Sequence, residues 1–252
     1  MESGVEYLTG EVTDAKITTN SFSDDLVIEN LTVAGSVNDT LTCGTVVNAC
    51  GPWAGHFMDQ LAFQCPSPDH VHRLPVKPRK RSIFLFHCQT TSDSSIEMPP
   101  TTTPLTIDPS GVYFRPEGHG GRFLCGVSPL EDPDCESIEE LRNCDPHLFD
   151  EIIWPTLYER VPAFGEIKVK SSWSGFYEYN TSDQNAIIGK HPNFTNLMLC
   201  NGFSGHGLQQ SPAAGRAISE LILEKNFVSI DLSRLSYERI RLNTPLFEEG
   251  IV

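Results

Sequence analysis

The sequence predicts an α+β fold, and three observations support this class. Residues 196–223 show a short apolar strand, a glycine-rich loop and then apolar residues at helical spacing. Residues 44–61 repeat this order around a second glycine turn. Residues 112–117 and 122–127 alternate in character on either side of a glycine cluster, which is typical of an antiparallel hairpin. The chain therefore combines strand-loop-helix units with an antiparallel sheet.

Length and charge limit the possible functions. A chain of 252 residues can form one large domain or two smaller ones. Its formal net charge of −15 argues against nucleic acid as a partner, because such binding depends on clustered Lys and Arg. No stretch approaches the roughly 18 apolar residues of a membrane span, so no transmembrane segment is expected. Residues 1–8 resemble neither a signal peptide nor a transit peptide, so targeting information is expected to be absent from this chain.

The eight cysteines form no CxxC pair and have no metal-ligand spacing. They are expected to be free thiols in a reducing compartment, and no metal site is predicted. Four sequons offer the alternative of a secreted glycoprotein, although chance explains them better in a chain rich in Asn, Ser and Thr. The sequons begin at Asn30, Asn38, Asn180 and Asn193.

The N-terminal region is expected to be a small antiparallel meander. Residues 4–48 alternate turn clusters with short β candidates, of which residues 4–8 are the first. Residues 44–49 form a continuous, β-branched run that predicts a strand buried on both faces. Residues 50–55 then make a glycine turn into a helix at residues 57–61. Trp53 in this turn is either a plug in the core or a ligand contact.

A basic cluster follows a linker at residues 65–75, which is rich in proline. Arg79, Lys80 and Arg81 stand before an expected strand at residues 83–87. The cluster is either a solvated strand entry or a site for a carboxylate or flavin, for which the planar guanidinium of Arg is well suited.

The middle of the chain contains a candidate site strand and an acidic segment. Tyr113 and Arg115 are two residues apart, so they share one face of their strand, and Arg115 is either solvated or a ligand contact. Residues 131–150 are acidic and predict a solvated loop rather than a metal site, because calcium-loop spacing is missing. Residues 147–160 have helical spacing with a kink at a proline, and residues 167–170 alternate as a strand.

The glycine loop at residues 201–207 is the strongest candidate for a ligand site. Its three glycines permit backbone conformations closed to other residues and allow a ligand to approach the main chain. Ser211 and Pro212 predict the start of the following helix, as cap and first helical residue. The unpaired N–H groups of such a helix favour an electron-rich or anionic ligand. The alternative is a tight strand-helix connection without a ligand.

Four stretches carry a family resemblance. They are GFSGHGLQQSPAAG at residues 202–215, NACGPWAG at residues 48–55, GVYFRPE at residues 111–117, and the aromatic segment from Trp173 to Gly189. Together they resemble the D-amino-acid oxidase and sarcosine oxidase superfamily of FAD enzymes, and within it a mitochondrial group linked to assembly of respiratory NADH dehydrogenase.

The resemblance implies a fold and a division into domains. It implies an antiparallel substrate-binding sheet plus the C-terminal pieces of a Rossmann-like, glutathione-reductase-type α/β domain that binds FAD. The implied parts are residues 1–64 of the FAD domain, residues 65–172 as the substrate-binding sheet, and residues 173–252 as the return to the FAD domain.

The resemblance also implies site residues. The substrate contacts it implies are Arg79, Arg81, Tyr113 and Arg115, and the catalytic candidates are Tyr113, Arg115, His206 and Gln209, with positioning favoured for His206. Gln209 stands where sarcosine oxidases carry a Lys implicated in oxygen activation, which favours a dehydrogenase or a structural flavin over an oxidase. No Cys lies near Tyr177, so a non-covalent flavin is implied. The implied FAD contacts are Val12, Gly51, Trp53, Gly202, Phe203, Ser204, Gly205, His206, Gly207 and Leu208.

One expected motif is missing from this sequence. The family holds the FAD pyrophosphate with a GxGxxG turn after its first strand, and no such turn opens this chain. The resemblance therefore covers the C-terminal half to two-thirds of the family protein, and an N-terminally shortened product is expected. Without the helix dipole and backbone cradle of that turn, the chain alone is expected to bind FAD weakly or not at all.

Three functions follow from the resemblance. The first is the C-terminal region of a mitochondrial FAD-dependent oxidoreductase with a role in assembly of respiratory NADH dehydrogenase, whose subunits are then possible partners. The second is an FAD-dependent dehydrogenase or oxidase of amines or N-methyl amino acids, in which the loop N–H groups stabilise negative charge on the flavin. The third is a non-catalytic assembly or binding module.

Overall fold

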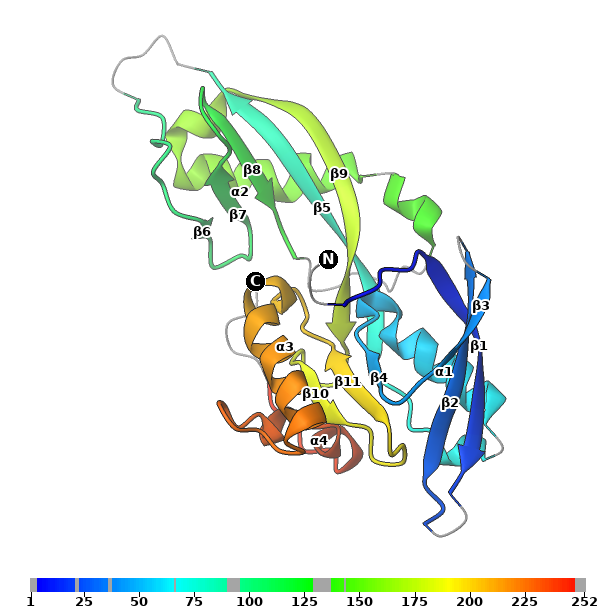
Figure 1. The fold of residues 1–252 in the computed structure, drawn as a ribbon. Coiled ribbons are helices and arrows are strands. Elements are labelled where there is room, and N and C mark those ends of the chain that lie inside the picture. The colour runs from blue at the N-terminus through cyan, green and yellow to red at the C-terminus, as the bar shows by residue number, and fades with distance from the viewer. Residues whose placement is uncertain are drawn as a thin grey trace. The chain divides into compact units, whose positions relative to one another are not determined.

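The structure is a computed structural model, and it describes residues 4–20, 23–35, 38–65, 67–89, 96–128, 137–142 and 144–247 (Figure 1). The chain forms two compact units. The first unit contains Met1–Lys77 and Glu178–Ile251, and the second contains Pro78–Tyr177. The predicted domain boundaries after residues 64 and 172 stay a prediction.

The first unit begins with the predicted meander. β1 (Gly10–Thr19), β2 (Leu26–Gly35) and β3 (Asp39–Thr42) form an antiparallel sheet in this order. The strand expected at residues 4–8 is absent from the structure, because these residues, mostly exposed, pair with no neighbouring strand among the described residues. The meander itself is confirmed.

A second sheet of the first unit carries the two predicted strand-loop-helix segments. Its order is β10 (Ile187–Lys190), β11 (Leu197–Asn201) and β4 (Val46–Asn48), with β11 parallel to β4 and antiparallel to β10. The expectation that β4 is buried on both faces is wrong, because Val47 is 38% exposed while its neighbours Val46 and Asn48 are buried. β4 is the last strand of this sheet, and α3 covers β10 and β11.

Helices cover both faces of this sheet (Figure 1). On one face the 3₁₀ turn η1 (Gly51–Trp53) leads into α1 (Ala54–Gln64), followed by the short turn η2 (Pro68–His70). On the other face lies α3 (Gly207–Leu223). Strand alternation sends Ile187, Leu197 and Leu199 into the core with α1 and the meander, whereas Ile188 and Met198 pack with α3. The chain ends with η6 (Ser233–Leu235) and α4 (Glu238–Arg241).

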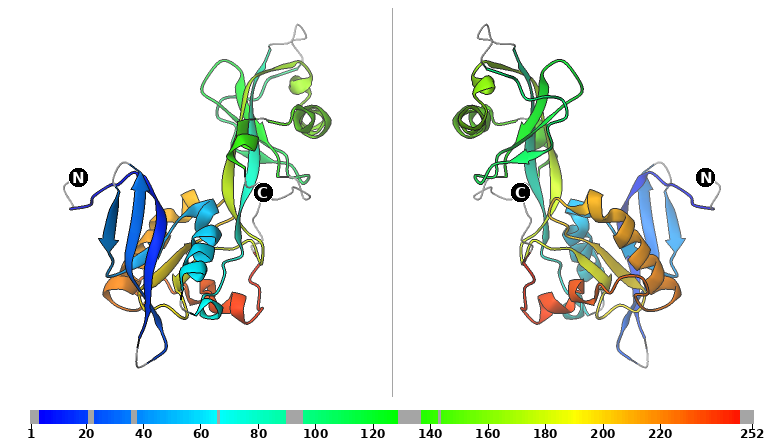
Figure 2. Two further views of the ribbon diagram at one scale, coloured as in Figure 1. Left: turned by 90° about the vertical axis from the view of Figure 1, so that its right-hand side faces the viewer. Right: turned by 90° about the vertical axis from the view of Figure 1, so that its left-hand side faces the viewer.

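The second unit is an antiparallel sheet with helical segments on one face (Figure 2). Its strand order is β6 (Thr106–Ile107), β7 (Tyr113–Pro116), β8 (Arg122–Gly126), β5 (Val76–Cys88) and β9 (Ile167–Asn180). The predicted hairpin of β7 and β8 is confirmed. Its core is aromatic, with Phe164 packed edge-on against three phenylalanines of the sheet. Those three are Phe86, Phe114 and Phe123.

The helix expected at residues 147–160 forms, and its hydrogen-bond pattern changes along its length. A π-helical turn, η4 (Leu148–Ile153), precedes α2 (Trp154–Arg160). Pro155 has no N–H group for the helical pattern, and the Trp154 N–H group just before it donates to the Phe149 carbonyl, five residues back, as in a π-helix. The 3₁₀ segments η3 (Ile138–Arg142) and η5 (Pro162–Gly165) complete the unit. Residues 131–136 and 143 of the acidic segment at residues 131–150 lie outside the described residues, as do residues 90–95.

Two further properties concern the described residues alone. None of their helices combines the length and apolar character that crossing a membrane requires. They contain no group of three or more His, Cys, Asp or Glu side chains that could hold a metal ion.

Candidate functional site

The candidate site lies at the carboxyl edge of the parallel pair β4 and β11. Parallel strands end at the same edge of a sheet, so the turn after β4 and the turn after β11 emerge together. The side chain of Asn201, at the end of β11, donates a hydrogen bond to the Asn48 carbonyl at the end of β4 (3.1 Å). This bond ties the two turns to each other, and ligands of open α/β sheets commonly bind at such an edge.

The turn after β11 depends on left-handed backbone conformations. Gly202 has a φ of 77° and Gly205 a φ of 95°, values at which a side chain is strained. Ser204 has a φ of 48° although it carries a side chain. Its buried hydroxyl accepts a hydrogen bond from the Asn180 N–H group (3.0 Å) and donates one to the Gly202 carbonyl (3.4 Å), which offsets the strain.

Glu178 occupies the inner side of this turn. Its carboxylate accepts hydrogen bonds from the N–H groups of Gly202 (2.8 Å) and Phe203. Burial raises the pKa of the Glu178 carboxyl, and the two amide donors only partly offset this. Gly202 and Phe203, two of the predicted FAD contacts, thus have amides that already bind Glu178.

The helix after the turn begins earlier than predicted. α3 starts at Gly207, with His206 as its N-cap residue, so Pro212 lies inside the helix rather than at its first position. The predicted cap at Ser211 is wrong, because the turn from Gly202 to Gly205 already sets the helical direction. Pro212 cannot donate to the Leu208 carbonyl, but the Ser211 hydroxyl donates to it instead (3.0 Å). Pro212 thus lacks the backbone donor of an ordinary helical residue, and the Ser211 hydroxyl replaces that donor.

The N-terminal end of α3 is open to solvent. Leu208 is 88% exposed, and Gly205 and Gln209 are also exposed. The N–H groups in the first turn of any helix have no acceptor within that helix, and they carry the positive end of its dipole. This end of α3 can therefore donate hydrogen bonds to an electron-rich group.

Two buried polar atoms beside the turn have no hydrogen-bond partner among the residues that the structure describes. They are Oδ1 of Asn201 and Nδ1 of His206. Buried polar atoms in folded proteins are nearly always paired, and an exception needs an explanation. A ligand with polar groups along its edge would supply the missing partners.

The turn after β4 contributes Gly51 and Trp53. Trp53 is 38% exposed, so it is not a fully buried core plug. Gly51 has a φ of 53°, and a Cβ atom added to it would meet nothing within 4 Å, so the space beside it is open. Val12, a further predicted FAD contact, lies in β1 and packs against the apolar core that includes α1.

The second unit brings some of the predicted substrate residues together. The Arg81 guanidinium lies 4.8 Å from the centre of the Tyr177 ring and donates a hydrogen bond to the Tyr177 hydroxyl (2.9 Å). Burial raises the pKa of the Tyr113 hydroxyl, while the positive charge of Arg81 acts in the opposite direction. Arg81, Tyr113 and Tyr177 therefore form one polar cluster, of which Tyr177 was not a predicted substrate contact.

The other basic residues of this unit face different partners. Arg115 is about half exposed and pairs with Glu117 at 2.5 Å, which favours the solvated interpretation of this residue. The Lys80 ammonium donates to the Glu140 carbonyl (2.7 Å). Arg79 is half-buried on β5.

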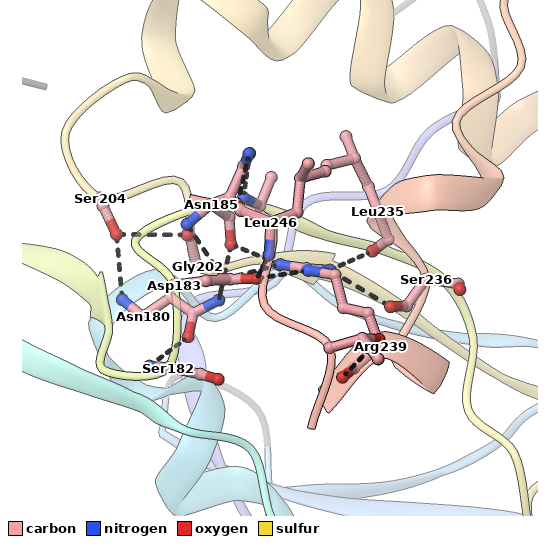
Figure 3. A network of polar contacts seen from close by, with 12 residues as sticks. Asn180, Ser182, Asp183, Asn185, Gly202, Ser204, Leu235, Ser236, Arg239 and Leu246 are labelled. Carbon is pink, nitrogen blue, oxygen red and sulfur yellow. Dashed lines mark hydrogen bonds and ion pairs between the residues drawn. The ribbon is translucent and has the colours of Figure 1, made fainter. Parts of the chain in front are cut away.

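Sequence reasoning missed several polar residues that support the turn after β11. Glu178 and Asn180 lie at the end of β9, and Asp183 lies in the turn that follows, where it pairs with Arg239 of α4 (Figure 3). The cluster Asn180–Asn185 has the composition of a turn stabilised by side chains, which was the available signal. Arg239 had no local signal. Asn180 is fully buried, so its sequon is not accessible to a glycan in this fold.

Comparison with known proteins finds similar chains among FAD-dependent oxidoreductases. The family model described as FAD dependent oxidoreductase (DAO) matches residues 1–221. FAD-dependent oxidoreductase domain-containing protein 1 of Xenopus laevis is 42% identical over 219 residues, which are 85% of this chain and 42% of that protein. Monomeric sarcosine oxidase of an Arthrobacter species is 24% identical over 217 residues, 84% of this chain and 51% of the enzyme.

A solved structure shows the same fold. L-proline dehydrogenase from P. horikoshii superimposes with a TM-score of 0.70 and 19% identity, over 94% of this chain and 55% of that one. The predicted fold class is thus confirmed. The chain spans about two-fifths of the length of the Xenopus relative.

Proposed function

This chain belongs to the family of FAD-dependent oxidoreductases, as its motifs predicted, and on that premise we propose that the candidate site holds the isoalloxazine ring of FAD without a covalent bond. We further propose that the complete protein oxidises the carbon-nitrogen bond of an amine or N-methyl amino acid. The observation that carries the first proposal is the open N-terminal end of α3 behind the Gly202–Gly205 turn, at the carboxyl edge of two parallel strands.

The residues at this edge fit a flavin ring. The first turn of α3 offers N–H groups to electron-rich ring atoms, and the unpaired Asn201 and His206 atoms match a ligand with polar groups along its edge. The exposed indole of Trp53 can pack on a flat ring. Bound FAD would supply the chemistry of accepting a hydride from the carbon next to the substrate nitrogen.

The Arg81, Tyr113 and Tyr177 cluster is the proposed substrate contact. The Arg81 guanidinium donates to the Tyr177 hydroxyl and to the Lys80 carbonyl (2.8 Å), and the planar fork of an arginine suits a carboxylate. Arg79 and Arg115 are weaker candidates for this role, and Arg115 is already paired with Glu117. A substrate with a carboxylate next to its amine fits this cluster.

Gln209 supports an electron acceptor other than oxygen. This residue is exposed in the first turn of α3, where it can face a bound flavin. Its neutral amide cannot supply a positive charge to a developing oxygen anion. We therefore propose a dehydrogenase rather than an oxygen-reducing oxidase, and Tyr113, Arg115, His206 and Gln209 stay candidates for catalytic roles.

Amide NMR of the 252-residue chain tests the flavin site even if binding is weak. FAD added to about 1 mM, a range that detects weak affinity, should shift the amide signals of residues 202–209 and of Gly51 and Trp53. A Gln209→Glu variant should weaken this response, because it places a negative charge at the proposed ring site. Ser219→Glu adds the same charge three turns further along α3 and should leave the response unchanged. Absence of any shift at these residues, or shifts confined to other parts of the chain, would refute the proposed site.

A cellular role is proposed from the resemblance. We propose a mitochondrial protein that acts in assembly of respiratory NADH dehydrogenase, with a non-catalytic assembly module as the alternative to an enzyme. The support is the identity of 42% to the Xenopus protein and 45% to a Drosophila melanogaster homologue. Cell fractionation and native gels of the respiratory complexes after depletion of the protein test this role. Reduction of the flavin by candidate amines in a complete protein would separate the enzyme from the module.

A further inference from the structure

We infer that Arg239, in the C-terminal segment, is a positioning residue for the turn after β11, acting through Asp183, Asn180 and Ser204. The inference rests on the proposed role of this turn in holding a flavin. Arg239 lies outside the residues that match the family model, which end at residue 221. A segment beyond the family match thus reaches the centre of the site's support.

The Arg239 guanidinium is buried and fully hydrogen-bonded (Figure 3). Nε and Nη2 donate to the two carboxylate oxygens of Asp183, at 2.6 and 3.0 Å. Arginine has five N–H donors, and the remaining three reach backbone carbonyls. These carbonyls belong to Leu235 (2.8 Å), Ser236 (3.2 Å) and Asn185 (3.0 Å). Such a set of bonds fixes the guanidinium in one orientation.

Asp183 connects Arg239 to the turn after β11 through hydrogen bonds. Its Oδ1 atom accepts a hydrogen bond from the Asn180 side chain (2.9 Å), and the Asn180 N–H group donates to the Ser204 hydroxyl (3.0 Å). Ser204 has the left-handed φ of 48° and donates to the Gly202 carbonyl. Strained conformations persist where the surroundings over-determine them, and this chain of bonds supplies that determination.

The C-terminal segment encloses Asp183 from a second direction. The Leu246 N–H group donates to Oδ2 of Asp183 (3.0 Å), and the Asn185 side chain donates to the Leu246 carbonyl (3.2 Å). The Arg239 carbonyl accepts from the Thr244 N–H group (2.9 Å), which closes the segment on itself. Residues 235–246 therefore bind the turn that carries Asn180 through several hydrogen bonds. Local unfolding of this segment should increase the mobility of Ser204.

Hydrogen exchange of the 252-residue chain tests the inference without a ligand. An Arg239→Gln variant should speed exchange at the amides of residues 180–185 and 202–206 by about tenfold or more, with β1 and β2 unchanged. The matched control is Arg241→Gln, two residues away in α4, where the exposed guanidinium pairs with Glu238. Wild-type exchange at residues 202–206 in a folded Arg239→Gln variant would overturn the inference.

A second variant avoids leaving a buried charge unpaired. Arg239→Gln with Asp183→Asn removes both charges, and the same increase in exchange at residues 202–206 is expected because the bidentate bond is still lost. Protection equal to that of the wild type in this folded variant would also overturn the inference.

The flavin titration separates the inference from the proposed function. If the inference and the proposed site are both right, the FAD-induced amide shifts at residues 202–209 should weaken in the Arg239→Gln variant and persist in Arg241→Gln. If the wild-type chain shows no FAD response while the exchange effect is present, the flavin site fails and the positioning role of Arg239 stands. Equal FAD responses in wild type and Arg239→Gln would count against the positioning role.

Discussion

Acid should destabilise this protein through one buried histidine, His191. The His191 ring packs between the rings of Phe194 and Tyr237, with centroid distances of 5.1 and 5.8 Å. Its Nδ1 atom accepts a hydrogen bond from the Asn193 N–H group (3.2 Å), and its Nε2 atom lies 3.4 Å from the His72 carbonyl oxygen. Burial lowers the pKa of His191 to about 4, and the hydrogen bond with the His72 carbonyl opposes this only in part.

The sign and size of the effect follow from this shift. The unfolded chain binds a proton at His191 near its ordinary pKa of 6.5, whereas the folded chain does so only near 4. Stability from the neutral ring is therefore present above pH 6.5 and falls as the pH drops toward 4. Linkage gives a loss of about 1.3 kcal/mol between pH 7.5 and 5.5. Tyr237 lies two residues before Arg239, so protonation of His191 should also destabilise residues 235–246, which bind Asp183.

Urea unfolding followed by far-UV circular dichroism measures this loss. The comparison is made at pH 7.5 and 5.5, since the sequence pI is near 4.8 and lower pH values would favour aggregation. A His191→Gln variant should lose about 1.3 kcal/mol less stability than the wild type between these pH values. His56, exposed on α1, provides the control variant His56→Gln, which should behave as the wild type. Equal losses in the wild type and His191→Gln would refute the reasoning.

Three further predictions concern the turn after β11. Gly202→Ala should destabilise the fold by about 1–2 kcal/mol in urea unfolding, because φ is positive and the new Cβ would lie 3.2 Å from Val76. The control is Gly215→Ala, which lies in open space on α3 and should stabilise the fold by about 0.5–1 kcal/mol. Gln209→Lys in a complete, FAD-loaded protein should raise the rate of flavin reoxidation by oxygen in stopped-flow measurements, and an unchanged rate would count against a dehydrogenase. In urea unfolding, Glu178→Gln should gain stability relative to the wild type as the pH rises above the ordinary carboxyl pKa of about 4.5. Burial raises the pKa of the folded Glu178 carboxyl, so the contribution of this group is lost as the pH rises through that pKa.

Local patterns were enough to predict much of the fold. The meander and the hairpin of β7 and β8 follow from apolar alternation broken by turn residues, and both involve strands adjacent in the sequence. The two strand-loop-helix segments were equally visible, because each is marked by a glycine turn. The parallel pairing of β4 and β11 joins residues about 150 positions apart, so apolar periodicity could not predict it.

The start of α3 shows why local signals failed at the site. Ser followed by Pro is a usual helix start, but the preceding glycines already turn the chain into the helix at Gly207. The proline is tolerated because the Ser211 hydroxyl satisfies the carbonyl that the proline cannot. The same two residues thus fit both interpretations, and only the tertiary position of the turn distinguishes them.

The residues that support the turn after β11 could not be predicted from the local sequence, for a different reason. Arg239 and Asp183 are 56 residues apart, and each residue alone resembles an ordinary surface charge in the sequence. A buried ion pair becomes recognisable only when both partners are placed. Glu178 was missed in the same way, because its role depends on the Gly202 amide, which lies 24 residues further along the chain.

The position of Glu178 also limits what the site can bind. Its carboxyl group takes two amides on the inner side of the turn, so ligand contacts are left to the outer side, at the first turn of α3. When Glu178 is ionised, its negative charge offsets the positive end of the helix dipole and repels an anionic ligand bound at the turn. A phosphate dianion would meet this repulsion in full, whereas a neutral ring with electron-rich atoms would meet little of it. The edge of β4 and β11 therefore suits an isoalloxazine ring better than a pyrophosphate, which agrees with a family in which a GxGxxG turn holds the pyrophosphate.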